Sequence, residues 1–225
     1  MTEKIPFTLK EPRYDPNTYW GRVFSLAEAS SVRYAFVTNS EVMRNYELVK
    51  KQEAREESAL AATGSTKVLL TAAEIEELRH ATNIVKAAIH PDTQKPIPMP
   101  MRITFFLPGN IPISMGFLFA APTMFNTILW QVINQTYNAI LNFGNANKSS
   151  PASTADIMTS YAMAVVASCS AGAAIRYASK GVTAKSSGGK LVVLNAIVST
   201  IACAGGGFAN NWFIRQPEVK TGIGI

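Results

Sequence analysis

Six side-chain amides recur at helical spacing in an otherwise apolar segment, and such groups can hydrogen-bond a small polar solute or a second helix. Residues 131–145 hold them: Gln131, Asn134, Gln135, Asn138, Asn142 and Asn145. At about 100° per residue, the six side chains fall within about 100° of a helix circumference, so they form a single polar stripe. In a membrane an unpaired amide is costly, because lipid offers no hydrogen-bond partner. The stripe therefore either joins helices or lines a pathway.

A glycine triplet lies in another apolar segment. Gly205, Gly206 and Gly207 are followed closely by Asn210. Glycines allow membrane helices to pack closely, or they unwind a helix and free its backbone groups for a ligand, as in the broken helices of transporters. Both roles stay open from the residues alone. Together with the six amides, these four residues form our candidate substrate-binding or helix-interface set.

Catalytic or metal-binding chemistry has no support in the sequence. There is no nucleophile–base spacing, no phosphate-cradling glycine loop and no cluster of metal-ligand residues. Cys169 and Cys203 lie within apolar runs, which favours buried thiols over a disulfide or a metal site. We therefore expect no enzyme activity, no catalytic residue, no metal and no cofactor.

The amide stripe has to be positioned by membrane helices. A helix needs about 20 apolar residues to cross a bilayer, and the chain has stretches of this length. Spans are expected at about residues 114–143, 157–178 and 191–214. The first is expected to be one long helix after an extended or interfacial entry to about Pro112. Residues 1–102 are expected to be helical and membrane-apposed, and residues 103–225 to form the transmembrane region. The expected fold class is therefore an all-α integral membrane protein.

Composition and charge agree with a membrane protein. Charged residues make up 16% of the chain, against about 25% in a typical soluble domain. Up to Arg102 acidic and basic residues nearly balance, whereas after it the only acids are Asp156 and Glu218. The later basic residues lie in short segments between apolar runs. A nucleic-acid footprint would need clustered basic residues with stacking aromatics, so we expect no nucleic-acid partner.

Three crossings would place residues 1–102 and the segment 180–190 on the same side, with the C-terminal tail across the membrane. The loop that holds segment 180–190, between the second and third expected spans, is the most basic one after the N-terminal region. Its basic residues are Arg176, Lys180, Lys185 and Lys190. The positive-inside rule assigns such a loop to the inner face.

Local signals organise the N-terminal region. Thr71 and Glu74 form a capping-box pattern that opens a helix. The charged run 50–57 is interpreted as a solvated face. At the end of the capped helix, we favour Asp92 as a turn former and His90 as a structural hydrogen-bond partner over a role in proton coupling or gating.

Several stretches, in a fixed order, resemble one family. They are YDPNTYWGR at residues 14–22; His90, Pro91, Asp92 and Thr93; WQ at 130–131 with INQTYNA at 133–139 and Asn142; and Arg215 with Gln216, Glu218 and GI at 222–223. The chain resembles the sideroflexins, mitochondrial inner-membrane proteins that transport serine and related small amino acids. The resemblance covers nearly the whole chain.

The resemblance implies a multi-pass protein of the mitochondrial inner membrane, with residues 1–102 on the matrix side, that transports serine or a related small neutral amino acid. The alternative is a non-transporting structural or accessory subunit of a larger mitochondrial membrane complex. Expected partners are membrane lipid, other membrane subunits or a second copy of the chain, and a small neutral amino acid. Neutral amides suit such a zwitterion, because they accept from its ammonium and donate to its carboxylate without a fixed countercharge.

The chain departs from the family pattern at several positions. Gln94 and Lys95 replace a usual Gly-Glu, Val132 a usual Trp and Ala146 a usual Arg. Gly207 occupies the first of two family asparagines, whereas Asn210 keeps the second. Family members also usually continue with further spans beyond the point at which this chain ends. These departures keep the structural-subunit alternative open.

Overall fold

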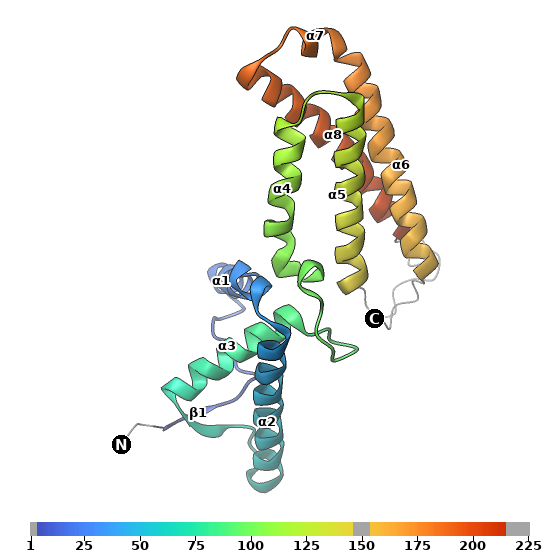
Figure 1. The fold of residues 1–225 in the computed structure, drawn as a ribbon. Coiled ribbons are helices and arrows are strands. Elements are labelled where there is room, and N and C mark those ends of the chain that lie inside the picture. Colours follow the sequence, from blue (N-terminus) through green and yellow to red (C-terminus); the bar gives the residue numbers. More distant parts are fainter. Residues whose placement is uncertain (1–3, 146–153, 215–225) are drawn as a thin grey trace. The chain divides into compact units, whose positions relative to one another are not determined.

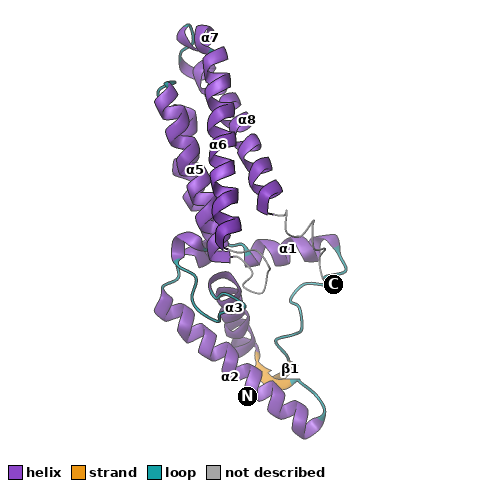
Figure 2. Cartoon of the chain, turned by 90° about the vertical axis from the view of Figure 1, so that its right-hand side faces the viewer, coloured by secondary structure: helices purple, strands orange, loops and turns teal. Residues whose placement is uncertain are grey.

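The computed structural model describes residues 4–145 and 154–214, and the chain divides into two compact units, Met1–Phe105 and Phe106–Ile225. Both described parts are mostly helical (Figure 2). The expected all-α class fits, except that the first unit also contains a small antiparallel sheet. In it, β1 (Lys4–Phe7) pairs with β2 (Val68–Thr71).

Capping residues define the helices of the first unit. The elements are α1 (Tyr19–Ala29), the 3₁₀ turn η1 (Val32–Phe36), α2 (Asn39–Thr63), α3 (Ala72–Ala88) and the 3₁₀ turns η2 (Met99–Met101) and η3 (Ile103–Phe105). The Thr38 side chain caps α2 by accepting from the backbone N–H of Glu41. Gly64 ends this helix with a φ of 70°, a left-handed conformation that favours glycine. The predicted capping box of Thr71 and Glu74 is present and opens α3.

The core of the first unit lies between α2, α3 and the sheet. One apolar cluster joins Tyr34, Val42, Ile84, Ala88 and Ile89, and a second joins Phe7, Leu70, Ile75 and Leu78. The charged run 50–57 is solvated on one side only, because Gln52 and Glu56 are buried on the inner face of α2. Glu56 accepts hydrogen bonds from the Thr8 hydroxyl and the Leu9 backbone N–H, both at 2.8 Å. The prediction of a solvated face is therefore wrong for these two residues.

A fully buried arginine closes the first unit. Arg102 has no exposed surface and donates to the backbone oxygens of Ile97 at 3.0 Å, Ala35 at 3.2 Å and Val37 at 2.6 Å, and to Asn39 Oδ1 at 3.0 Å. Burial lowers the pKa of this guanidinium from its ordinary value. The hydrogen bonds join the segment before η3 to η1 and to the start of α2.

The second unit is made of helices that alternate in direction (Figure 1). They are α4 (Phe106–Phe119), α5 (Met124–Asn145), α6 (Thr154–Ala178), the short α7 (Lys180–Ala184) and α8 (Gly188–Ile214). The start of α4 and the end of α8 lie at one end of this unit, and α7 lies at the other. Within the described residues, Ala155–Ala178 and Gly188–Trp212 are long and apolar enough to cross a membrane.

The single long helix predicted for residues 114–143 is wrong, because the chain turns back between α4 and α5. Pro122 lacks a backbone N–H and does not continue the helix. Thr123 Oγ1 accepts from the backbone N–H of Asn126 at 3.1 Å, and the Asn126 side chain donates to the Ala121 oxygen at 2.8 Å. The expected extended entry is also wrong, since Pro112 lies inside α4.

This turn changes the expected topology. Residues 1–102 were expected to share a side with segment 180–190. However, α4 begins at one end of the second unit, whereas α7 lies at the other (Figure 1). The structure therefore gives no support to a shared side for residues 1–102 and segment 180–190.

Candidate functional site

An open groove of about 530 Å³ lies in the second unit, between α4, α5 and α8. Its lining is apolar with interspersed neutral polar groups, and consists of Phe106, Asn110, Ile113, Ser114, Phe117, Leu118, Asn134, Asn138, Ala196, Ser199, Thr200 and Cys203. No residue of this lining carries a formal charge. A groove of this kind offers hydroxyl and amide groups to a neutral or zwitterionic solute.

The deep part of the amide stripe joins α5 to α8 through a thiol. Gln131 is 1% exposed, and its Oε1 accepts from the Sγ of Cys203 at 3.6 Å. Asn134 Nδ2 donates to the same sulfur at 3.5 Å and also lines the groove. These two amides therefore act partly as a link between helices, which was one of the two alternatives from the sequence.

One glycine of the triplet, Gly206, lets α8 pack closely against α5 and α6. A Cβ added to Gly206 would lie 2.4 Å from Gln135 Nε2 and 2.8 Å from the Cβ of Ser168, so only glycine fits there without a shift. A Cβ added to Gly205 would lie 3.8 Å from the Cβ of Ala171, which is an ordinary contact. A Cβ added to Gly207 would have no neighbour within 4 Å. Since α8 is helical throughout, the structure favours packing over an unwound helix at this triplet.

The other stripe residues reach the groove and the surface. Asn138 is half-buried and lines the groove, whereas Asn142 is exposed. The Asn145 side chain donates to the backbone oxygen of Leu141 at 2.7 Å, and Asn210 is half-buried on α8. The structure thus divides the stripe into a helix-linking part and a groove-lining part.

The HPDT motif forms a turn in the first unit. His90 is 5% exposed, and its Nδ1 accepts from the backbone N–H groups of Asp92 at 3.1 Å and Thr93 at 3.4 Å. Pro91 lies at the start of this turn, three positions after Ala88, the last residue of α3. These contacts are those of a structural hydrogen-bond partner. Arg215, the first residue of the C-terminal family motif, lies outside the described residues.

Sequence reasoning missed a polar cluster around Arg176, which it counted within a basic loop. Arg176 lies inside α6 and is 8% exposed. Its Nε donates to Thr127 Oγ1 and its Nη2 to Asn195 Oδ1, both at 2.9 Å. The signal was present in the sequence, because Arg176 lies within the expected span 157–178 and Asn195 within the expected span 191–214, and such residues are unusual inside membrane spans.

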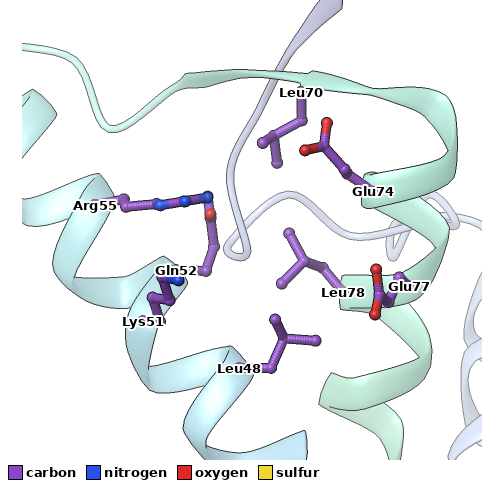
Figure 3. A pocket seen from close by; sticks show the side chains of 8 residues that line it. All are labelled: Leu48, Lys51, Gln52, Arg55, Leu70, Glu74, Glu77 and Leu78. Carbon is purple, nitrogen blue, oxygen red and sulfur yellow. The ribbon is translucent and has the colours of Figure 1, made fainter.

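A second hollow, of about 130 Å³, lies between α2 and α3 in the first unit (Figure 3). Lys51 and Arg55 reach it from α2, and Glu74 and Glu77 from α3, with leucines between them. Facing charges of opposite sign are typical of a solvated seam between two helices, and we assign no ligand to it. In the described parts of both units, no group of three or more His, Cys, Asp or Glu side chains could hold a metal ion.

Comparison with known proteins gives one family. The family model for sideroflexins matches residues 8–225. Sideroflexin FSF1 of Saccharomyces cerevisiae is 30% identical over 98% of this chain and 63% of the yeast protein. A sideroflexin of Dictyostelium discoideum is 32% identical over 95% and 61% of the two chains, and human sideroflexin-5 is 26% identical over 98% and 61%. The chain thus spans less than two thirds of the length of these relatives. No solved structure matches the chain.

Proposed function

We propose that this chain, which belongs to the sideroflexin family, helps to carry a small neutral amino acid, such as serine, across the mitochondrial inner membrane. The proposal rests on one observation in the second unit. The groove between α4, α5 and α8 offers uncharged amides and hydroxyls within an otherwise apolar lining. Its volume of about 530 Å³ lies within the usual range for small-molecule sites.

The groove chemistry suits a zwitterion that carries a hydroxyl. The side-chain oxygens of Asn134 and Asn138 can accept from an ammonium group, and their nitrogens can donate to a carboxylate. Ser199 and Thr200 on α8 add hydroxyls that can bond a serine side chain. A strongly charged side chain would find no countercharge in this lining. The groove therefore favours small neutral amino acids over acidic or basic ones.

The helix lengths support a membrane setting. A bilayer core is about 30 Å thick, and at 1.5 Å per residue it is crossed by about 20 residues. α6 and α8 meet this length with apolar sequences. α5 has 22 residues but carries the amide stripe, and α4 has 14. The groove side of α5 needs protein neighbours, and α4 and α8 supply them.

If α4, α5, α6 and α8 all cross the membrane, the first unit lies on the side at which α4 begins. The segment with Lys180, Lys185 and Lys190 then lies on the other side. By the positive-inside rule this basic segment faces the matrix. The first unit would then face the intermembrane space, which reverses the side expected from the sequence.

Transport assays in reconstituted vesicles test the proposed function. Vesicles that contain the protein should take up labelled serine faster than empty vesicles. Unlabelled alanine or glycine should compete with this uptake, whereas aspartate and lysine should compete weakly. Uptake equal to that of empty vesicles would contradict transport by this chain alone.

A second candidate is a structural subunit of a larger membrane complex, and the openness of the groove favours it. Asn138 is only half-buried and Asn142 is exposed, so a helix of another protein or of a second copy could cover them. Stable co-purification with other membrane subunits, together with no measurable uptake, would favour this function over transport.

A further inference from the structure

Arg176 is held firmly by neutral groups. Thr127 on α5 and Asn195 on α8 accept from its Nε and Nη2. Asn195 is itself fixed, because its Nδ2 donates to the backbone oxygens of Leu118 at 3.1 Å and Ala120 at 3.3 Å at the end of α4. The guanidinium of Arg176 is thus held by hydrogen bonds to two other helices, α5 and α8, and the α8 partner is fixed in turn by the end of α4.

The charge of Arg176 has no counterpart in the described part of the second unit. Its Nη1 is buried, and it donates to no acceptor among the described residues. In residues 106–145 and 154–214 the only acidic residue is Asp156, twenty positions earlier on the same helix and therefore about 30 Å away. An uncompensated buried charge is costly, so such a residue in an apolar helix is expected to face an anionic partner.

Space for a ligand lies beside this guanidinium. Arg176 lines a hollow of about 400 Å³ together with Lys180, Tyr177 and Thr183. It also lines a small hollow that includes Phe117 and Ser199, two residues that line the amide groove as well. Arg176 therefore lies beside the hollow at the α7 end of the unit, and Phe117 and Ser199 connect its surroundings to the amide groove.

The polar stripe of α5 leads to this arginine. Thr127, Gln131, Asn134 and Asn138 are spaced by four, three and four residues, so they lie on one face of the helix. Thr127 contacts Arg176, and Asn138 lines the groove about three turns away along α5. One continuous polar face thus connects neutral amides to a fixed positive charge.

We propose that Arg176 binds the carboxylate of the transported solute at a second position on its path, separate from the amide groove, so that transported molecules must carry a carboxylate. The inference rests on the proposed function and deepens it. A guanidinium with a free, fixed N–H is well suited to a carboxylate, since charge-assisted hydrogen bonds of this kind are short and strong.

A thermal-shift experiment on the purified full chain in uncharged detergent tests this binding. L-serine should raise the melting temperature, whereas L-serinamide, which keeps the ammonium and the hydroxyl but lacks the carboxylate, should not. Arg176→Gln should weaken the apparent serine affinity by about tenfold or more, because it removes a charged hydrogen-bond donor. Arg176→Lys keeps the charge without the planar fork and should show an intermediate loss.

Lys180→Gln is the matched control, because it removes the same charge from an exposed residue in the same hollow. It should change the serine affinity by less than about threefold. An equal loss in Lys180→Gln and Arg176→Gln would overturn a specific site at Arg176. Equal stabilisation by serine and serinamide would also overturn it, and this comparison needs no variant, so it remains decisive if Arg176→Gln does not fold.

Two further measurements are informative. Phosphate-containing probes distinguish a carboxylate site from a phosphate site, and uptake assays distinguish the carboxylate site at Arg176 from the proposed transport function. Stabilisation by anionic phospholipid or inorganic phosphate, with none by serine, would assign the site to a phosphate group and contradict the carboxylate site. Serine uptake by Arg176→Gln with an unchanged KM would overturn this inference while the proposed function stands. Carboxylate-dependent stabilisation without any uptake would uphold the site and contradict transport.

Discussion

Gly116 of α4 lies directly against the indole ring of Trp130 of α5. A Cβ added to Gly116 would lie 2.2 Å from the ring, and one added to Gly109 would lie equally close to the Tyr137 side chain. The two glycines are seven residues apart, as are their two aromatic partners, and the order along the chain is reversed. This pairing is that of an antiparallel hairpin whose helices approach closely because two side chains are missing.

The hairpin makes Gly116→Ala destabilising. Although alanine is the better helix former by about 0.5–1 kcal/mol, the added methyl group collides with Trp130, and overpacking of this kind costs about 1–3 kcal/mol. Gly207→Ala is the matched control, because nothing lies within 4 Å of its added Cβ. Thermal unfolding in detergent should show a lower melting temperature for Gly116→Ala and an equal or higher one for Gly207→Ala. A reversed order would contradict the close packing of α4 on α5.

Arg102 should be irreplaceable in the first unit. Lysine cannot reproduce its hydrogen bonds to three backbone oxygens and Asn39, so Arg102→Lys should lose about 3 kcal/mol or more of stability. Arg44→Lys on the exposed face of α2 should lie within about 0.5 kcal/mol of the unaltered protein. Denaturant unfolding of the full chain measures both, and similar values for the two variants would be evidence against the role of Arg102.

The capping box of α3 should contribute a pH-dependent term to stability. Hydrogen bonds from the Thr71 backbone N–H and hydroxyl hold the pKa of Glu74 below its usual range. A carboxyl group whose pKa is lower in the folded state stabilises the protein above its unfolded pKa of about 4.3 and loses this contribution as the pH falls through the folded value. Glu74→Gln should therefore melt earlier than the unaltered protein at pH 7, and the difference should shrink at pH 3. A difference that grows in acid would contradict this linkage.

Cysteine labelling tests the alternation of the helices across the membrane. Ser65→Cys in the first unit and Ser187→Cys before α8 are both exposed positions. With four crossings, a membrane-impermeant reagent should label only one of the two variants in intact mitoplasts, and the other only after the membrane is permeabilised. Labelling of both from the same side would exclude this arrangement and restore three crossings.

Local signals in the sequence were sufficient for parts of the fold. The capping box of Thr71 and Glu74 depends on residues three positions apart, so it could be recognised without tertiary information. The break at Pro122 was visible too, but the apolar character of its surroundings suggested a continuous span. The turn contacts of Thr123 and Asn126, together with the packing of Gly116 on Trp130, show that α4 folds back on α5.

The sequence was sufficient to predict that the amides share one face of a helix, but not which residues they contact. Periodicity placed the amides on one side of α5, yet it could not tell that Gln131 and Asn134 would meet Cys203 of α8 or that Asn138 would line a groove. Such contacts join residues about 70 positions apart and depend on tertiary packing. For the same reason, Arg176 was assigned to a loop, because its partners Thr127 and Asn195 lie on other helices.

Serine uptake by vesicles that contain Asn138→Leu, measured beside Asn142→Leu, tests the transport site most directly. Both variants replace the same amide by the same apolar side chain on the same helix, one turn apart, but only Asn138 lines the groove. Uptake should fall by about tenfold or more in Asn138→Leu, because a hydrogen bond to a charged solute group is lost, and should stay within about twofold in Asn142→Leu. Equal uptake by both variants, with equal melting temperatures, would contradict a solute site in this groove.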